Sequence, residues 1–284
     1  MLLKSYKTTF LQELSTLYDA MEIESFFYIV LECFHNKKRI DLALNPEMEI
    51  DAVQLLRWES VLVDLKKQKP IQYILGKTEF YGLKILVNEN TLIPRPETEE
   101  LVEWILQNPK LQSKDNSLNI VDIGTGSGCI AISLAKNLIN AEVSAIDVSE
   151  KALTMAKKNA ELNKVNVNFI HKNILETTDL GIQYDIIVSN PPYVRNLEKE
   201  EIKTNVLEFE PHLALFVEDN DALLFYRKIA QLALIHLSSN GCLYFEINQY
   251  LGNETVELLE NLGFNNIELK KDIYGNDRMI MCKK

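Results

Sequence analysis

The chain has 284 residues, of which 46% are hydrophobic and 25% charged, a balance typical of a globular protein with one or two domains. Its 30 Lys and Arg residues against 41 Asp and Glu residues give a formal net charge of −11, which disfavours nucleic acid as a partner because an acidic surface repels phosphates. The four widely spaced cysteines, Cys33, Cys129, Cys242 and Cys282, indicate neither a zinc site nor a disulfide framework, so we expect no metal and reduced thiols.

The first part of the chain has apolar residues at helical spacing. Phe10, Leu14 and Leu17 are followed by the run from Phe26 to Phe34, and later by Leu62. Apolar residues that recur every three to four positions line one face of a helix. We therefore predict a small helical domain over residues 1–75.

A hairpin is predicted after this domain. Residues Lys77 to Val87 alternate between apolar and polar around Tyr81-Gly82, which is the pattern of two strands joined by a tight turn. We take residues 76–92 as a linker that contains this hairpin. Residues 93–284 then form the third part of the chain.

The third part alternates between short β-rich runs and helical stretches, which is typical of a mostly parallel sheet with crossover helices. Its last two runs are joined by Tyr274 to Asp277, a connection too short for a parallel pair. We predict an α/β, Rossmann-like sheet of seven strands, mostly parallel, with an antiparallel strand at the end. The apolar stretch Ala222 to Leu237 contains Arg227, so we expect a helix there and no membrane span; with a polar N-terminus, this favours a cytoplasmic protein.

A glycine-rich loop joins the first strand of this sheet to the first helix. The loop comprises Gly124, Thr125, Gly126, Ser127 and Gly128. Glycines let the backbone approach a ligand, and a helix N-terminus offers free N–H groups. The spacing G-x-G-x-G differs from the G-x-G-x-x-G of dinucleotide sites. It favours S-adenosylmethionine, which has no pyrophosphate, over a dinucleotide. The flanking strand and helix and the acid that ends the next strand favour a cofactor loop over a simple glycine-rich turn.

Two further residues are candidates for the same cofactor. Asp147 ends the second strand, where its two oxygens can accept hydrogen bonds from both ribose hydroxyls. Asn173 follows the third strand and is placed to reach an adenine edge, but an ordinary loop asparagine fits its position equally well. Both interpretations of Asn173 stay open.

The most specific pattern is Asn190-Pro191-Pro192-Tyr193, which follows the strand YDIIV. A primary amide nitrogen is a poor nucleophile because its lone pair is delocalised into the carbonyl. The side-chain oxygen of Asn190 and the backbone carbonyl of Pro191 can each accept one N–H and so fix that nitrogen for methyl transfer. The prolines restrict the backbone, and Tyr193 supplies a flat wall for the substrate. A simple strand terminator is the alternative.

Together these residues resemble the bacterial release-factor glutamine methyltransferases. Further segments similar to that family are Pro70 to Gly76, Phe80-Tyr81-Gly82, Leu92 to Glu99, Phe209-Glu210-Pro211, Phe245-Glu246-Ile247 and Lys271 to Arg278. The resemblance covers most of the chain and implies that the substrate is the Gly-Gly-Gln loop of peptide chain release factors. The implied products are N5-methylglutamine and S-adenosylhomocysteine.

The resemblance also implies residue roles. Residues Gly124 to Gly128 and Asp147 would bind S-adenosylmethionine, Asn190 would contact both cofactor and substrate, and residues Asn190 to Tyr193 would hold the glutamine. The helical domain would recognise the protein partner, and we expect a monomer. Asn173 stands where the family usually has aspartate, and Asn248 replaces a usual glycine; we expect neither departure to touch the core of the reaction.

Three other functions compete with this one. An adenine methyltransferase would face the same lone-pair problem, but the net charge of −11 and the lack of a basic recognition domain argue against it. A nicotinamide-dependent oxidoreductase would carry G-x-G-x-x-G and no Asn-Pro-Pro-Tyr. A non-catalytic protein with the same fold would bind the cofactor without turnover.

Overall fold

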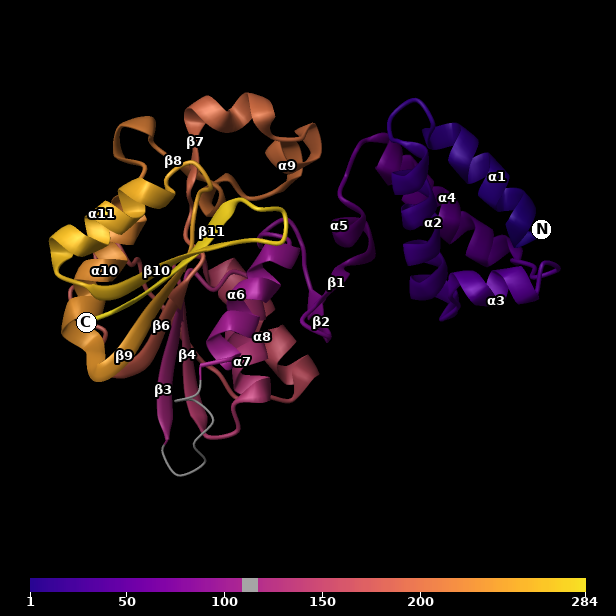
Figure 1. The fold of residues 1–284 in the computed structure, drawn as a ribbon. Helices are drawn as coiled ribbons and strands as arrows, with labels where there is room; N and C mark the ends of the chain where they lie inside the picture. The colour runs from indigo at the N-terminus through magenta and orange to yellow at the C-terminus, as the bar shows by residue number, and fades with distance from the viewer. Residues whose placement is uncertain (109–116) are drawn as a thin grey trace. The chain divides into compact units, whose positions relative to one another are not determined.

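The computed structural model describes residues 1–108 and 117–284 and divides them into two compact units. The first unit comprises Met1–Gly76 with Thr204–Phe209, and the second comprises Lys77–Lys203 with Glu210–Lys284. Figure 1 labels the elements of both. No helix in the part of the chain that the structure describes is long and apolar enough to cross a membrane.

The first unit is helical, as the periodicity predicts. Its helices are α1 (Leu3–Leu14), α2 (Ala20–His35), α3 (Arg39–Leu44), α4 (Ala52–Lys66), α5 (Ile71–Leu75) and α9 (Thr204–Phe209). The Asp19 carboxylate caps α2 by accepting from two backbone N–H groups, and Asp51 and Gln54 form a reciprocal capping box at the start of α4. Aromatic rings pack at the centre, where Phe27 and Trp58 lie 4.9 Å apart between centroids.

The predicted hairpin is confirmed as β1 (Lys77–Phe80) and β2 (Leu83–Leu86), paired antiparallel. Tyr81 and Gly82 both have positive φ angles, 49° and 70°, which suits a two-residue hairpin turn. The hairpin groups with the second unit, because the buried Asn159 side chain exchanges hydrogen bonds with the backbone N–H and carbonyl of Leu86.

The sheet of the second unit has seven strands in the order β10-β11-β9-β6-β3-β4-β5. Their bounds are β3 (Leu118–Ile123), β4 (Ala141–Asp147), β5 (Asn168–His171), β6 (Tyr184–Ser189), β9 (Leu237–Glu246), β10 (Asn265–Lys271) and β11 (Asp277–Lys283). Strands β9, β6, β3, β4 and β5 are parallel to their neighbours in this series, and β11 is antiparallel to both β9 and β10. The predicted fold class is confirmed.

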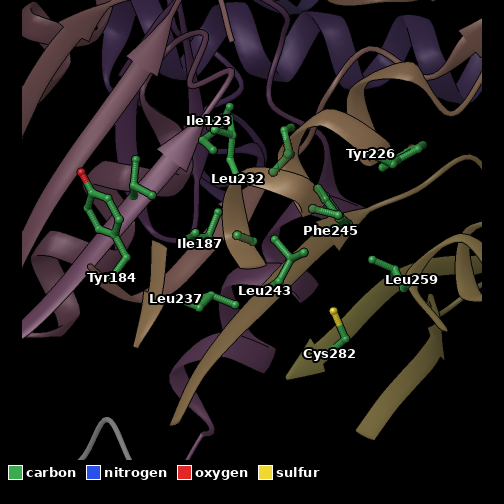
Figure 2. Packing of buried hydrophobic residues seen from close by; sticks show 14 of the residues in the cluster. Ile123, Tyr184, Ile187, Tyr226, Leu232, Leu237, Leu243, Phe245, Leu259 and Cys282 are labelled. Atoms are coloured by element: carbon green, nitrogen blue, oxygen red, sulfur yellow. The ribbon is translucent and has the colours of Figure 1, made fainter. Parts of the chain in front are cut away.

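Helices cover both faces of this sheet (Figure 1). One face carries α6 (Pro96–Leu106), α7 (Cys129–Asn137) and α8 (Glu150–Asn163), and the other carries α10 (Leu224–His236) and α11 (Gly252–Leu262). Figure 2 shows the apolar cluster on the α10 side, where Ile187, Leu243 and Phe245 of the strands gather near Leu232 of the helix. This layered core fixes the strand ends that carry the candidate site.

The segment between β6 and α10 carries no element predicted from the sequence. It contains β7 (Val194–Arg195), β8 (Phe216–Val217) and α9, with 3₁₀ helices over Asn196–Glu201, His212–Ala214 and Asp219–Asp221. Such short elements have too few residues to show a periodic pattern. The β7 and β8 strands pair parallel and hold the chain that follows Tyr193.

Candidate functional site

The sheet topology brings the candidate residues to one edge. The glycine loop follows β3, Asn190 follows β6, Asp147 ends β4 and Asn173 comes after β5. These strands are parallel neighbours, so their carboxyl ends lie together. Strands β4 and β5 follow one another on one side of β3, and β6 and β9 follow on its other side. A crevice for a ligand is expected where the strand order reverses in this way, beside β3 and β6.

The glycine loop has a backbone that L side chains would strain. Gly124, Gly126 and Gly128 have φ angles of 76°, 56° and 82°. A Cβ atom on Gly128 would lie 3.0 Å from the Ala156 Cβ atom, so glycine lets α7 pack against α8. A Cβ atom on Gly126 would meet nothing within 4 Å. The loop is therefore packed on one side and open to a ligand on the other.

Two loop residues turn their side chains into the fold. Thr125 and Ser127 are both buried, and the Thr125 hydroxyl donates to an Asp122 oxygen at 2.6 Å. The Ser127 carbonyl accepts a hydrogen bond from the Asn159 side chain at 2.9 Å. Both residues can thus offer a ligand their backbone rather than their hydroxyl groups. Asn159 also holds β2, so it ties the hairpin to the glycine loop.

Asp122 is a candidate that the sequence interpretation did not assign. It is fully buried, and its second oxygen, Oδ1, has no hydrogen-bond partner among the described residues. Burial raises the pKa of Asp122 to about 7; hydrogen bonds from the Thr125 hydroxyl and the Ala131 backbone oppose that rise, and the nearby Asp147 charge adds to it. A buried carboxylate with an unpartnered oxygen is stabilised by a cationic ligand. An acidic residue two positions before G-x-G-x-G is the sequence signal that could have identified it.

Asp147 contacts the glycine loop directly. Its Oδ2 atom accepts from the Gly126 N–H at 2.8 Å, and its Oδ1 atom accepts from the Ser149 N–H at 2.8 Å. Burial raises the pKa of Asp147, and these two backbone hydrogen bonds oppose that rise. Each carboxylate oxygen keeps a further lone pair for an incoming hydroxyl. The carboxylate therefore orders the loop and keeps lone pairs for a ligand.

Asn173 has a local structural use. Its side-chain oxygen accepts from the Leu175 N–H at 3.1 Å, and its carbonyl accepts from the Thr177 hydroxyl at 2.8 Å. Such a side-chain turn is what an ordinary loop asparagine provides. The Asn173 side-chain oxygen therefore shapes this turn, and the adenine contact stays a prediction.

The Asn190 to Tyr193 segment lies against the glycine loop. The Asn190 carbonyl oxygen is 3.9 Å from the position of a Cβ atom on Gly124, and the Ser189 hydroxyl donates to the Ile123 carbonyl at 2.6 Å. Within the described ranges, neither the Asn190 side-chain oxygen nor the Pro191 carbonyl accepts a hydrogen bond. Two acceptors in this segment are thus left for a ligand.

A buried carboxylate lies behind this segment. The Glu246 Oε1 atom accepts from the Tyr193 hydroxyl at 3.1 Å, and Oε2 accepts from the Thr98 hydroxyl at 2.6 Å. The Asn190 side-chain nitrogen donates to the Thr98 oxygen at 3.3 Å. Burial raises the pKa of Glu246, whereas its hydrogen bond from Thr98 and the Arg278 charge lower it. The sequence predicts no role for Thr98 or Glu246, although both lie in segments that resemble the family pattern.

Asn248, a departure from the family pattern, contacts the segment that follows β6. The Asn248 side-chain nitrogen donates to the Tyr193 carbonyl at 2.9 Å and to both Glu198 oxygens, at 2.9 and 3.2 Å. Asn248 is 4% exposed. A side chain at this position can brace the turn after Tyr193, which a glycine could not do.

The arrangement suits positioning more than acid–base chemistry. No group of three His, Cys, Asp or Glu residues within residues 1–108 and 117–284 is arranged to hold a metal ion. Burial and the Glu246 carboxylate raise the pKa of the Tyr193 hydroxyl, so this group stays protonated. The open acceptors of Asn190 and Pro191 can hold an N–H-bearing group beside the glycine loop.

The chain matches two protein families. Residues 99–211 match the Methyltransferase small domain, and residues 12–76 match the PrmC N-terminal domain. A solved methyltransferase structure from Pyrococcus furiosus is 20% identical with a TM-score of 0.52, and the match covers 72% of this chain and 90% of that one. At this identity the likeness is one of fold.

Two relatives match along nearly the whole chain. The release factor glutamine methyltransferase of Bacteroides thetaiotaomicron is 41% identical over 275 residues, which cover 96% of this chain and 97% of the relative. That of Flavobacterium psychrophilum is 70% identical over 281 residues, which cover 99% of this chain and 98% of the relative. The chain that places Asn190 beside a glycine loop therefore belongs to the release factor glutamine methyltransferase family.

Proposed function

We propose that this protein methylates the side-chain amide of the glutamine in the Gly-Gly-Gln motif of peptide chain release factors, with S-adenosylmethionine as methyl donor. The products are N5-methylglutamine and S-adenosylhomocysteine. The observation that carries the proposal is the pair of open acceptors on Asn190 and Pro191 beside the glycine loop. The relatives named above support the choice of substrate.

The glycine loop and two carboxylates would hold the cofactor. The backbone of Gly124 to Gly128 lets a ligand approach closely, and Asp147 accepts from the ribose hydroxyls. The unpartnered oxygen of the buried Asp122 supports a cationic ligand at this edge of the sheet. S-adenosylmethionine, when bound, supplies an electrophilic methyl group. Asn173 is a weaker contact in this proposal, because its side-chain oxygen already serves a turn.

Asn190 and Pro191 would activate the substrate by orientation. The Asn190 side-chain oxygen accepts one N–H of the glutamine amide, and the Pro191 carbonyl accepts the other. With both hydrogens held, the nitrogen turns out of conjugation as positive charge develops on it, and the two acceptors stabilise that charge. Asparagine has no basic group at neutral pH, so the proton lost after methyl transfer leaves to solvent.

Tyr193 and Pro192 would form the walls of the glutamine site. The Tyr193 hydroxyl is anchored by Glu246, which leaves the ring face to pack against the substrate side chain. Both prolines lack an N–H, so neither competes for the acceptors of the segment. Asn190 would contact both cofactor and substrate, since its carbonyl lies against the glycine loop and its side-chain oxygen is open.

The helical unit would recognise the release factor. All residues assigned to chemistry lie outside residues 1–75, and α4 exposes a row of apolar side chains at Val53, Leu56 and Val63, between 51% and 71% exposed. Residues three and seven positions apart share a helix face, which suits a protein partner. We expect the protein to act in the cytoplasm, on release factors, and as a monomer.

The proposal is tested by incubating the protein with a purified release factor and S-adenosylmethionine labelled in its methyl group. Label should appear in the release factor, and none in duplex or single-stranded DNA under the same conditions. Transfer to DNA with none to the release factor would favour the adenine methyltransferase. Cofactor binding without any transfer would favour a non-catalytic protein.

A further inference from the structure

Thr98 occupies the third position of α6 and is 3% exposed, between the carboxylate of Glu246 and the side chain of Asn190. We propose that Thr98 and Glu246 are positioning residues that fix the rotation of the Asn190 side-chain amide, so that its oxygen and not its nitrogen faces the substrate. This inference rests on the proposed function.

The hydrogen atoms at this contact can be assigned one by one. A hydroxyl group has one hydrogen to donate, and an ionised carboxylate can accept but has none to give. The Thr98 hydroxyl lies 2.6 Å from Glu246 and commits its hydrogen there. Its oxygen can therefore present only lone pairs to Asn190, 3.3 Å away. Asn190 must then turn its NH₂ group towards Thr98, which leaves its oxygen on the opposite side.

Glu246 holds the other end of this arrangement. It is 1% exposed and accepts from two hydroxyls at once, those of Thr98 and Tyr193. The charged group that stabilises its anion is Arg278, while the Glu97 carboxylate opposes ionisation. Because each oxygen of the carboxylate accepts one of these hydrogen bonds, the two hydroxyls that flank the reacting segment have fixed hydrogen directions.

The rotation of Asn190 decides whether the site can work. With the oxygen outward, the side chain accepts an N–H of the glutamine amide. With the amide rotated by half a turn, an NH₂ group would face the NH₂ of the substrate, and two donors would oppose each other. The two orientations of the Asn190 amide have nearly the same shape, so packing alone distinguishes them poorly. The hydrogen bond to the Thr98 hydroxyl selects one of them.

Thr98→Val tests the inference because valine keeps the shape and loses the hydroxyl. We expect turnover on the release factor to fall on the order of 10²-fold, the scale for a misaligned reacting group, with the Kd for S-adenosylhomocysteine unchanged. Thr98→Ser restores the hydroxyl and should recover most of the turnover. The matched control is Thr255→Val, a buried helical threonine whose hydroxyl donates to the Leu251 backbone carbonyl, where turnover should stay normal.

Nuclear magnetic resonance gives a readout that does not depend on turnover. The Asn190 side-chain amide signals, assigned by their loss in Asn190→Asp, should shift in Thr98→Val and stay in place in Thr255→Val. Unshifted signals or normal turnover in folded Thr98→Val would overturn the inference. If wild-type protein transfers no methyl group to the release factor, the proposed function fails, and the amide signals still decide the orientation.

Glu246→Gln provides a second variant if Thr98→Val does not fold. Glutamine has one side-chain oxygen, so only one of the Thr98 and Tyr193 hydroxyls keeps its acceptor. Turnover should again fall while cofactor affinity holds. Normal turnover in folded Glu246→Gln whose Asn190 amide signals have shifted would overturn the inference, since it would show that the orientation of that amide does not matter.

Discussion

Replacing Asp147 by alanine removes a carboxylate that serves two partners. One is the glycine loop, through the 2.8 Å hydrogen bond from the Gly126 N–H, and the other is the proposed ribose. Two charge-assisted hydrogen bonds to the ribose would together be worth about 3 kcal/mol or more at about 1.5–3 kcal/mol each. Water can reach the hydroxyls in the alanine variant and offsets part of that loss. We therefore expect cofactor affinity to fall by about 2–3 kcal/mol, which is roughly 30- to 140-fold in Kd.

Isothermal titration with S-adenosylhomocysteine measures this change. The matched control is Glu142→Ala, an exposed acidic residue near the start of the same strand, where the Kd should stay as in the wild type. An analogue without the ribose hydroxyls separates the two effects of Asp147. It should bind the wild type weakly and lose little more in Asp147→Ala. Equal Kd values for Asp147→Ala and wild type with the full cofactor would refute the ribose contact.

Four further predictions concern the reacting segment, the partner and pH. Asn190→Ala should lower turnover on the order of 10²-fold or more with a smaller loss of cofactor affinity, and near-normal turnover would reduce the segment to a strand terminator. Asn248→Gly removes the hydrogen bond to the Tyr193 carbonyl, so it should lower turnover by roughly tenfold and leave the cofactor Kd unchanged. Turnover equal to that of the wild type would show that this hydrogen bond is dispensable. Leu56→Lys on the exposed face of α4 should raise KM for the release factor without changing the cofactor Kd, and an unchanged KM would remove that face from the proposed interface. Asp122, with a pKa raised to about 7, is ionised above that pH and protonated below it, so affinity for the cationic cofactor should decline as pH falls through 7. Asp122→Asn should flatten this dependence of affinity on pH. The same slope in both proteins would show that another group causes it.

The sheet and the cofactor loop are predictable because their signals are local. The run Leu118 to Ile123 and the glycines after it lie within a dozen positions, and most of the short β-rich runs are followed by a helical stretch. The hairpin is also local, since Tyr81-Gly82 alone sets its turn. These elements and the loops that follow them are therefore predictable from the sequence.

The hydrogen bonds among the residues that pack against the Asn190 to Tyr193 segment are not predictable in this way, because they depend on the order of strands in space. The hydrogen bond from Thr98 to Glu246 joins residues 148 positions apart, and that from Asn248 to Tyr193 joins residues 55 positions apart. These contacts form because β9 pairs with β6 and α6 packs beside β9. The glutamic acid of a buried strand end has no signature of its own in a single sequence, since its role comes from the partners that the fold brings to it.

The central claim is that the methyl group is transferred to a release-factor glutamine. The most direct measurement is mass mapping of a purified release factor after incubation with this protein and methyl-labelled S-adenosylmethionine. The labelled peptide should contain the Gly-Gly-Gln motif, with the methyl group on the side-chain nitrogen of its glutamine, and Asn190→Ala should lower the rate of labelling on the order of 10²-fold or more. Label on another residue, or an unlabelled release factor in the presence of protein that binds the cofactor, would contradict the claim.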